Sequence, residues 1–253
     1  LAVDLRMDAL GGLFSLIILG MGALVLLYCW GYFDGTRRRL AMFAAQMVGF
    51  ATAMFGLVAA DNFLLMYVFW EITSLLSYLL VSYYAERASS RRAAQQALMV
   101  TALGGLTMLM GIILLGRQTG AWTFSDISAY ENFAQTPYVT VAIVLILAGA
   151  LTKSAIVPAH FWLPGAMAAP TPVSAYLHSA AMVKAGIYLV GRLAPSMYEV
   201  ATWHVVVISL GVFTMLLGGW MALKQRDLKL VLAYGTVSQL GFITSIAAVG
   251  SRD

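Results

Sequence analysis

The sequence predicts an all-α membrane protein, a polytopic bundle of about eight transmembrane helices within a larger subunit. Three observations support this prediction. Of the 253 residues, 61% are hydrophobic and only 10% are charged, whereas a soluble domain carries about 25% charged residues. The apolar residues form long runs, with a mean hydropathy of +0.86 for the whole chain. Most basic residues lie in short clusters between these runs.

Eight apolar runs are each long enough to cross a bilayer, which takes roughly 20 residues of α-helix. Each run is expected to be helical, because hydrocarbon offers no hydrogen-bond partner to an irregular backbone. The predicted spans are 9–33, 40–60, 62–84, 93–116, 138–157, 173–192, 203–223 and 230–249. We expect residues 1–253 to form a single membrane domain and to be a piece of a longer protein.

Basic residues are divided unevenly between the two ends of these spans. The loops after the first, third and seventh spans hold nine of them: Arg37, Arg38, Arg39, Arg87, Arg91, Arg92, Lys224, Arg226 and Lys229. The opposite ends hold Arg6, Arg117, Arg192 and Arg252. Cytoplasmic loops carry the excess of lysine and arginine. The sequence therefore predicts a multi-pass protein of the cell membrane (inner or plasma membrane), with both ends of the chain outside the cytoplasm.

The connection between the fifth and sixth spans, PAHFWLPGAMAAPTP, is rich in proline and has no basic residue. Proline removes a backbone donor and clashes with the preceding turn of a helix. Pro158 and Pro164 are therefore predicted to break the helix, and Lys153 lies just before the break. We expect a discontinuous helix in the Lys153/Pro158 region.

Four ionisable side chains lie inside the apolar runs: Glu71, Lys153, His178 and Lys184. A charge at bilayer depth costs about 2.5–3.5 kcal/mol on insertion scales, so each must be compensated. At 1.5 Å per residue, Glu71 lies roughly 14 Å into its span, near the bilayer centre. Small polar residues nearby, in the segments ITS, TKS and TPVSAYLHS, can hold water between the charges. Such a set is what a proton relay requires.

Static roles compete with this interpretation. A Glu71–Lys153 pair could join two helices without moving protons, and Lys184 could extend toward the membrane surface. His178 could be a hydrogen-bonded packing residue. His160 and His204, near helix ends, are interpreted as interfacial residues. The four buried groups taken together favour the relay.

Other kinds of chemistry lack their motifs here. The chain has one cysteine, Cys29, so it has neither an internal disulfide nor a paired-cysteine metal site. It has no phosphate-binding loop and no dinucleotide fingerprint. The basic clusters follow membrane topology and not a nucleic-acid surface. We therefore expect no cofactor, no metal ion and no nucleic-acid partner.

Several segments resemble one family of membrane proteins. KSAIVPAHFWLPGAMAAPTPVSAYLHSAAMVKAGIYL (153–189) resembles the signature of the antiporter-like subunits shared by Mrp-type Na⁺/H⁺ antiporters and the membrane arm of respiratory complex I. DNFLLMYVFWEITSLLSYLLVSYY (61–84) and RDLKLVLAYGTVSQLGF (226–242) resemble the same family. DLRMDALGGLF (4–14) resembles the entry to its third span, and the motifs follow the family's order and spacing.

This resemblance implies two inverted helix repeats, with this chain similar to the family's third to tenth spans. Glu71 falls on the family's glutamate of the fifth span, and Lys153 on the lysine of its broken seventh span. His178 and Lys184 fall on polar positions of the eighth span. The resemblance implies that Lys153 carries a proton, pairs with Glu71 in one state, and passes its proton toward His178 and Lys184 after separation. The family's later lysine, on the twelfth span, falls beyond residue 253.

Within the family, FWEITSLLSYLL most resembles the large A-type subunits of Mrp antiporters. This branch implies a transporter subunit and no enzyme, with smaller membrane subunits as partners and protons and Na⁺, or another monovalent cation, as cargo. The alternative is a proton-pumping subunit in the membrane arm of NADH:quinone oxidoreductase, although its WEGVG-type sequence is absent here. A third hypothesis is a membrane scaffold with a static Glu71–Lys153 pair.

Overall fold

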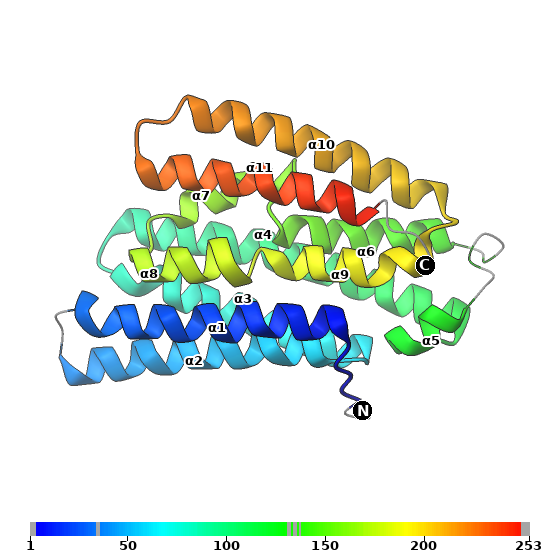
Figure 1. The fold of residues 1–253 in the computed structure, drawn as a ribbon, viewed down its shortest axis with the longest axis horizontal. Coiled ribbons are helices and arrows are strands. Elements are labelled where there is room, and N and C mark those ends of the chain that lie inside the picture. The colour runs from blue at the N-terminus through cyan, green and yellow to red at the C-terminus, as the bar shows by residue number, and fades with distance from the viewer. Residues whose placement is uncertain (1–3, 34–35, 131–132, 134–135, 137, 249–253) are drawn as a thin grey trace.

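The described part of the chain is a bundle of helices that run along one common long axis (Figure 1). The computed structural model describes residues 4–33, 36–130, 133, 136 and 138–248, and these residues form no β-strand. The long helices are α1 (Ala9–Tyr32), α2 (Arg37–Ala59), α3 (Phe63–Val81), α4 (Ala88–Thr119), α10 (Ala201–Leu223) and α11 (Leu228–Ala248). The shorter elements are η1 (Ser82–Tyr84), α5 (Phe124–Ala129), α6 (Val139–Lys153), η3 (Ala159–Phe161), α7 (Trp162–Ala166), α8 (Thr171–Val173), η4 (Ser174–Ala181) and α9 (Lys184–Met197).

The six long helices are each long and apolar enough to cross a membrane. They correspond to six of the eight predicted spans, with ends that differ by a few residues. α4 is the largest exception, because it begins five residues before the predicted run and continues three residues past it. The predicted all-α polytopic bundle is therefore confirmed, and the chain is a multi-pass membrane protein. Val249, the last residue of the eighth predicted span, lies outside the described residues.

The fifth predicted span is discontinuous, as expected, but it does not break at proline. α6 ends at Lys153, Ser154 caps it, and Ala155 takes a left-handed φ of 52°. A residue in this conformation commonly ends a helix. Pro158 lies in the connection between the end of α6 and η3, so it is not the breaking residue.

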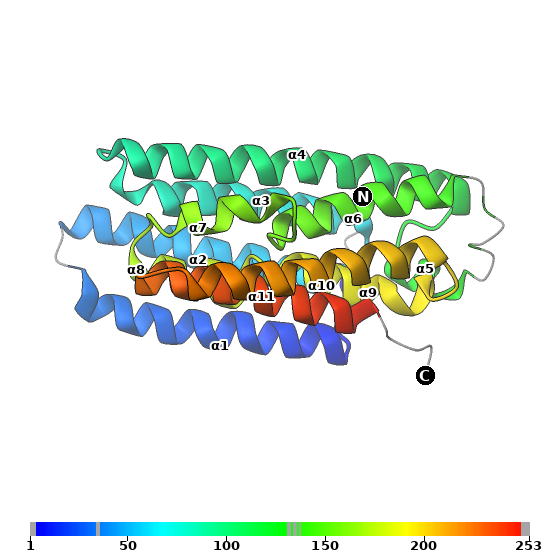
Figure 2. The same cartoon turned by 90° about the horizontal axis from the view of Figure 1, so that it is seen from above.

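The prediction for Pro164 was also wrong. This proline is the third residue of α7 and lies inside its first turn. The backbone N–H groups in the first turn of a helix have no acceptor within the helix, so proline is tolerated there. Both views show α6 and α7 following one another along the long axis, as two parts of one interrupted span (Figure 2).

The sixth predicted span is interrupted as well, which the sequence analysis missed. α8 continues into η4, a π-helical segment whose wide turns end in a hydrogen bond from the Met182 N–H to the carbonyl of Leu177, 2.8 Å. Met182 and Val183 form a turn, and α9 begins at Lys184. Wide π turns inside helices are frequent at functional sites. No proline or glycine stands between Ser174 and Lys184 to mark this break.

The two ends of the bundle differ in charge. The α1–α2, α3–α4 and α10–α11 connections meet at one end, which we call the basic end because it carries the nine clustered lysines and arginines (Figure 1). The start of α1, α5 and the end of α9 lie at the opposite end, with Arg6 and Arg192. The predicted division is thus present in the described residues; Arg252 lies outside them.

Glycines allow α4 and α6 to pack with their backbones close together. A Cβ atom at Gly149 of α6 would overlap the side chain of Met108 and lie 2.5 Å from the carbonyl oxygen of Gly104. A Cβ at Gly111 of α4 would lie 2.7 Å from the carbonyl oxygen of Ala142. Small residues at contacts between membrane helices permit this approach. The contact packs the body of α6 closely against α4.

Gly149→Ala should lower the melting temperature of the full-length protein in detergent. The added methyl group has no room, and overpacking of a tight core costs about 1–3 kcal/mol. Gly235→Ala is the matched control, because nothing lies within 4 Å of a Cβ at that position of α11. Equal melting temperatures for the two variants would contradict the close packing of α4 and α6.

Candidate functional site

Lys153 is fully buried at the end of α6, and its amine binds α3. Its Nζ donates to the carbonyl oxygen of Trp70 at 2.7 Å, to Thr73 Oγ1 at 2.6 Å and to Ser74 Oγ at 3.1 Å. The same nitrogen lies 4.4 Å from the centroid of the Trp70 ring. A lysine ammonium has three donor hydrogens. Three neutral acceptors and one aromatic face therefore satisfy it without water or a carboxylate.

The acceptors come from a single turn of α3. Thr73 and Ser74 also donate their hydroxyl hydrogens to the Trp70 carbonyl, at 2.7 and 3.2 Å. Serine and threonine within helices commonly bond to carbonyls three or four residues back. With its own hydrogen used in this way, each hydroxyl presents its lone pairs to Lys153. The sequence analysis expected these residues to hold water; they bind the lysine directly.

Glu71 is the next residue after Trp70 but lies toward α4. Its Oε1 is so close to Gly105 that a Cβ there would overlap it, and Tyr67, one turn earlier, hydrogen-bonds the carboxylate. Oε1 itself is buried without a hydrogen-bond partner in the described structure. None of the ion pairs between described residues joins Glu71 to Lys153, although the two groups interact electrostatically. The two side chains are therefore not in direct contact in this structure.

His178 lies on η4 and is fully buried. Neither of its ring nitrogens has a hydrogen-bond partner among the described residues. Its ring faces the edge of Trp162 at a centroid distance of 6.0 Å. Buried polar groups are normally hydrogen-bonded, so these two nitrogens are exceptional. The alternative role as a hydrogen-bonded packing residue finds no partner here.

Lys184 begins α9 and is half-buried. It lines an open cavity of about 490 Å³ between α1, η4 and α11, together with Ser174 and Lys229. Ser174 is buried and its hydroxyl has no partner among the described residues. Lys184 thus faces a space with room for water, whose polar lining groups are Lys184, Lys229, Ser174 and Thr171 among mostly apolar side chains. The structure places Lys153 where the end of α6 meets α3, Glu71 on the side of α3 toward α4, and His178 and Lys184 on the second broken span.

Polar side chains from neighbouring elements stabilise the first helix break. The indole Nε1 of Trp162 donates to the carbonyl of Thr152 at 3.0 Å, joining α7 to the last turn of α6. The N–H of Val157 donates to Thr214 Oγ1 of α10, also at 3.0 Å. A broken helix leaves backbone groups that must find partners away from water. The sequence analysis missed Thr214 and the role of Trp162, since both partners lie far along the chain or across the break.

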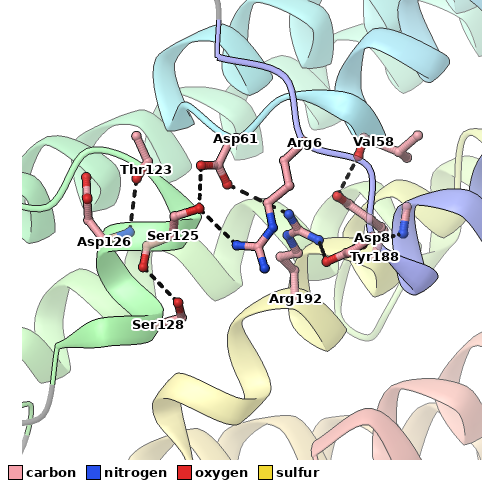
Figure 3. A network of polar contacts seen from close by, with 11 residues as sticks. Arg6, Asp8, Val58, Asp61, Thr123, Ser125, Asp126, Ser128, Tyr188 and Arg192 are labelled. Carbon is pink, nitrogen blue, oxygen red and sulfur yellow. Dashed lines mark hydrogen bonds and ion pairs between the residues drawn. The ribbon is translucent and has the colours of Figure 1, made fainter.

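A second polar cluster lies at the end of the bundle opposite the basic end, and Figure 3 shows it. Arg192 of α9 forms an ion pair with Asp8, and its Nη2 lies 3.8 Å from Asp61 Oδ1. Ser125 donates to Asp61 Oδ2 at 2.7 Å and accepts from Arg6 Nη1 at 2.9 Å. We call these five residues the arginine clasp. It joins the N-terminal segment, the α2–α3 connection, α5 and α9; the sequence analysis used Arg6 and Arg192 only as topology markers.

Asp8 also caps α1. The N–H of Gly11 donates to Asp8 Oδ1 at 2.8 Å, the usual role of an aspartate at a helix N-terminus. Burial raises the pKa of Asp8, but the Gly11 N–H and the Arg192 guanidinium oppose it and together hold the pKa below its ordinary value of 3.8. The carboxylate therefore stays charged and paired over the physiological range.

Comparison with known proteins assigns the fold to a family. Residues 60–253 match the family described as "NADH:quinone oxidoreductase/Mrp antiporter, TM". The chain belongs to this family. The matched region contains all four ionisable residues predicted for the relay, from Glu71 on α3 to Lys184 on α9.

The related proteins carry the names of A-type antiporter subunits. The chain is 45% identical over 249 residues to "Na(+)/H(+) antiporter subunit A1" of Staphylococcus aureus strain bovine RF122 / ET3-1, and equally so to that of strain JH9. These matches cover 98% of this chain and 31% of each relative. A chain of the Mrp complex from Dietzia sp. DQ12-45-1b superposes with a TM-score of 0.91 at 40% identity, over 97% of this chain and 27% of that one. The resemblance to Mrp antiporter subunits is confirmed, and the chain spans about a third of the length of these relatives.

Arg192→Gln should destabilise the full-length protein. Its side chain is only 5% exposed, and its removal leaves Asp8 and Asp61 without their counter-charge. Breaking a fully buried pair costs roughly 3–5 kcal/mol, and the cost here should be smaller because the Asp8 side chain is 34% exposed. The control is Arg39→Gln, which breaks the exposed Arg39–Glu86 pair, of a kind that contributes about 0–1 kcal/mol. Thermal melting in detergent should separate the two variants clearly. Similar small shifts for both would show that the clasp contributes little.

Protonation of Asp8 should lower the stability of the folded protein at acid pH. Because its pKa is lowered in the folded protein, its contribution is complete above the ordinary value of 3.8 and is lost as the pH falls through the lowered folded value. Asp8→Asn keeps a capping side chain but cannot ionise. Between about pH 5 and pH 2, the melting temperature of the wild type should fall more steeply than that of Asp8→Asn. Parallel curves would contradict this assignment.

Proposed function

We propose that this chain forms a proton-translocating core in the large subunit of a multisubunit Na⁺/H⁺ antiporter, with Glu71, Lys153, His178 and Lys184 as its relay. One observation carries the proposal: Lys153 is fully buried beside a helix break, and its amine is bound by neutral groups while Glu71 lies near without touching it. A lysine held in this way can exist in two arrangements that differ in their counter-charge. The names of the related antiporter subunits support the transport role.

The chemistry follows from the contacts of α3. Trp70 and Glu71 are consecutive residues of α3, and Glu71 interacts electrostatically with Lys153. We infer that a movement of the α6 end takes the amine from the Trp70 carbonyl toward the Glu71 carboxylate. Pairing with a carboxylate stabilises an ammonium, and separation from it favours release of the proton. In the arrangement seen here the Lys153 ammonium keeps three neutral acceptors but has no direct counter-charge, so it would hold its proton less firmly than when paired with Glu71.

The receiving groups lie on the second broken span. Trp162 contacts both sides, because its indole bonds the carbonyl of Thr152 and its ring packs on His178. His178 has two ring nitrogens without partners among the described residues, and these can accept and donate a proton in turn. Lys184 then faces the cavity of about 490 Å³. We infer that water in this cavity continues the path.

The wider assignment follows from the relatives. We infer that residues 1–253 correspond to the family's third to tenth spans, that smaller membrane subunits are partners, and that Na⁺ or a similar cation is exchanged. The basic end would face the cytoplasm, which places both ends of the chain outside it. Such a subunit is a secondary transporter and not an enzyme. The family description also covers NADH:quinone oxidoreductase; the identity to antiporter subunits favours the antiporter.

Lys153→Ala should abolish Na⁺-dependent proton movement in inverted membrane vesicles that contain the full-length subunit with its partners. Loss of a proton-transfer group typically lowers a rate by about 100-fold or more. The measurement is the initial rate of pH change after addition of Na⁺, divided by the amount of assembled complex on a blot.

Lys224→Ala is the matched control, because Lys224 is an exposed lysine of the basic end whose amine contacts only the Trp220 ring among the interactions described. It should keep the wild-type rate. Normal assembly with surviving exchange in Lys153→Ala would make Lys153 a static contact, as the scaffold hypothesis requires. A wild-type complex without cation exchange would favour the complex I alternative.

A further inference from the structure

The two helix breaks meet each other inside the bundle. α6 ends at Lys153 and is followed by Ser154; α9 begins at Lys184 and is preceded by Val183. The hydroxyl of Ser154 donates a hydrogen bond of 2.7 Å to the carbonyl oxygen of Val183. Both residues are buried, with 1% and 0% of their surface exposed. Each of the two lysines is therefore the direct chain neighbour of a residue in this bond.

The backbones at this contact are unusually close. A Cβ atom at Gly186, in the first turn of α9, would overlap the carbonyl oxygen of Ala150 and the hydroxyl of Ser154. Glycine is thus required where the first turn of α9 packs against the last turn of α6. The Ser154 bond and the Gly186 contact lie on the same face, so the two broken ends form one packed unit.

We propose that Ser154 is a positioning residue that couples Lys153 to Lys184. The inference rests on the proposed function, in which protons pass from Lys153 toward Lys184. Ser154 acts through the backbone: when the end of α6 moves Lys153 away from its acceptors on α3, the bond to Val183 carries the start of α9 with it. The separation of the two lysines is then preserved while the distance from Lys153 to Glu71 changes.

An equivalent bond elsewhere in the bundle provides a control. Ser238 of α11 donates to the carbonyl oxygen of Met215 of α10 at 2.8 Å. It has the same chemistry and also joins two helices, but neither residue is near a relay lysine in the chain. Loss of this bond should leave transport unchanged, whereas loss of the Ser154 bond should not.

The test uses Ser154→Ala, Ser154→Cys, Ser238→Ala and Ser238→Cys in the full-length subunit, assembled with its partners. Initial rates of Na⁺-dependent proton movement in inverted vesicles are measured per assembled complex over a range of pH. Loss of one neutral hydrogen bond corresponds to about a two- to tenfold change in an equilibrium or rate. Ser154→Ala should slow transport by this factor, and Ser154→Cys, with its weak S–H donor, should be intermediate. Both Ser238 variants should stay within about twofold of the wild type.

The pH profile separates positioning from simple structural support. The proton affinity of Lys153 depends on its distances to Glu71 on α3, His178 on η4 and Lys184 on α9, so uncoupling should also shift the pH of half-maximal transport. A Ser154→Ala complex with the wild-type rate and profile would overturn the proposal. So would a reduced amount of complex whose rate per complex and profile are unchanged.

Two further outcomes keep the inference testable. If Ser154→Ala fails to assemble, the cysteine variants decide. A Ser154→Cys complex with slower transport and a shifted pH profile, beside a normal Ser238→Cys complex, supports coupling, and equal behaviour of the two overturns it.

Lys153→Ala distinguishes this inference from the proposed function. Transport that survives in Lys153→Ala removes the function itself, whereas its loss, with normal Ser154 variants, removes only the coupling.

Discussion

The structure depends on one requirement: an ammonium group buried in an apolar bundle must find an acceptor for each of its hydrogens. For Lys153 these acceptors are the Trp70 carbonyl and the Thr73 and Ser74 hydroxyls. They lie on a single turn of α3, and α6 ends at the level of this turn. The close packing around Gly149 holds the body of α6 against α4. An unsatisfied charge would cost more than any of these contacts stabilises.

Ending a helix within the membrane creates a second requirement, because the freed backbone groups also need partners. Neighbouring side chains supply them: Trp162 of α7 donates to the Thr152 carbonyl, Thr214 of α10 accepts from the Val157 N–H, and the Ser154 hydroxyl donates to the Val183 carbonyl before α9. These hydrogen bonds stabilise the interrupted helix through polar partners and not through apolar packing. The polar, interrupted region that results faces Thr73 and Ser74 of the intact helix α3, so polar groups from both sides meet there.

Much of this arrangement could be predicted from residue patterns, and the features that were not predicted have physical causes. The spans, the basic end and the four buried ionisable groups follow from hydropathy and charge. The prolines predicted a break in the Lys153/Pro158 region, but not its exact position, because the helix ends at a left-handed Ala155 and an alanine in the sequence does not indicate that conformation. The turn at Val183 follows a π-helical segment without proline or glycine. The arginine clasp joins Arg192 to Asp8, 184 residues earlier, and no local pattern indicates a contact of that separation.

The positions of the fixed and breakable contacts indicate which part of the molecule can move. At one end, the arginine clasp ties α9 to three other segments through charged, buried contacts, and removing one partner there is costly. At the level of the breaks, Lys153 donates hydrogen bonds to three uncharged acceptors, and the Glu71 carboxylate, on the next residue after Trp70, is an alternative partner. α9 is therefore anchored at Arg192 and adjustable at Lys184, about two turns earlier. A helix fixed at its far end and joined to α6 near its start can tilt with α6 without leaving the bundle, which is the motion that a coupled relay requires.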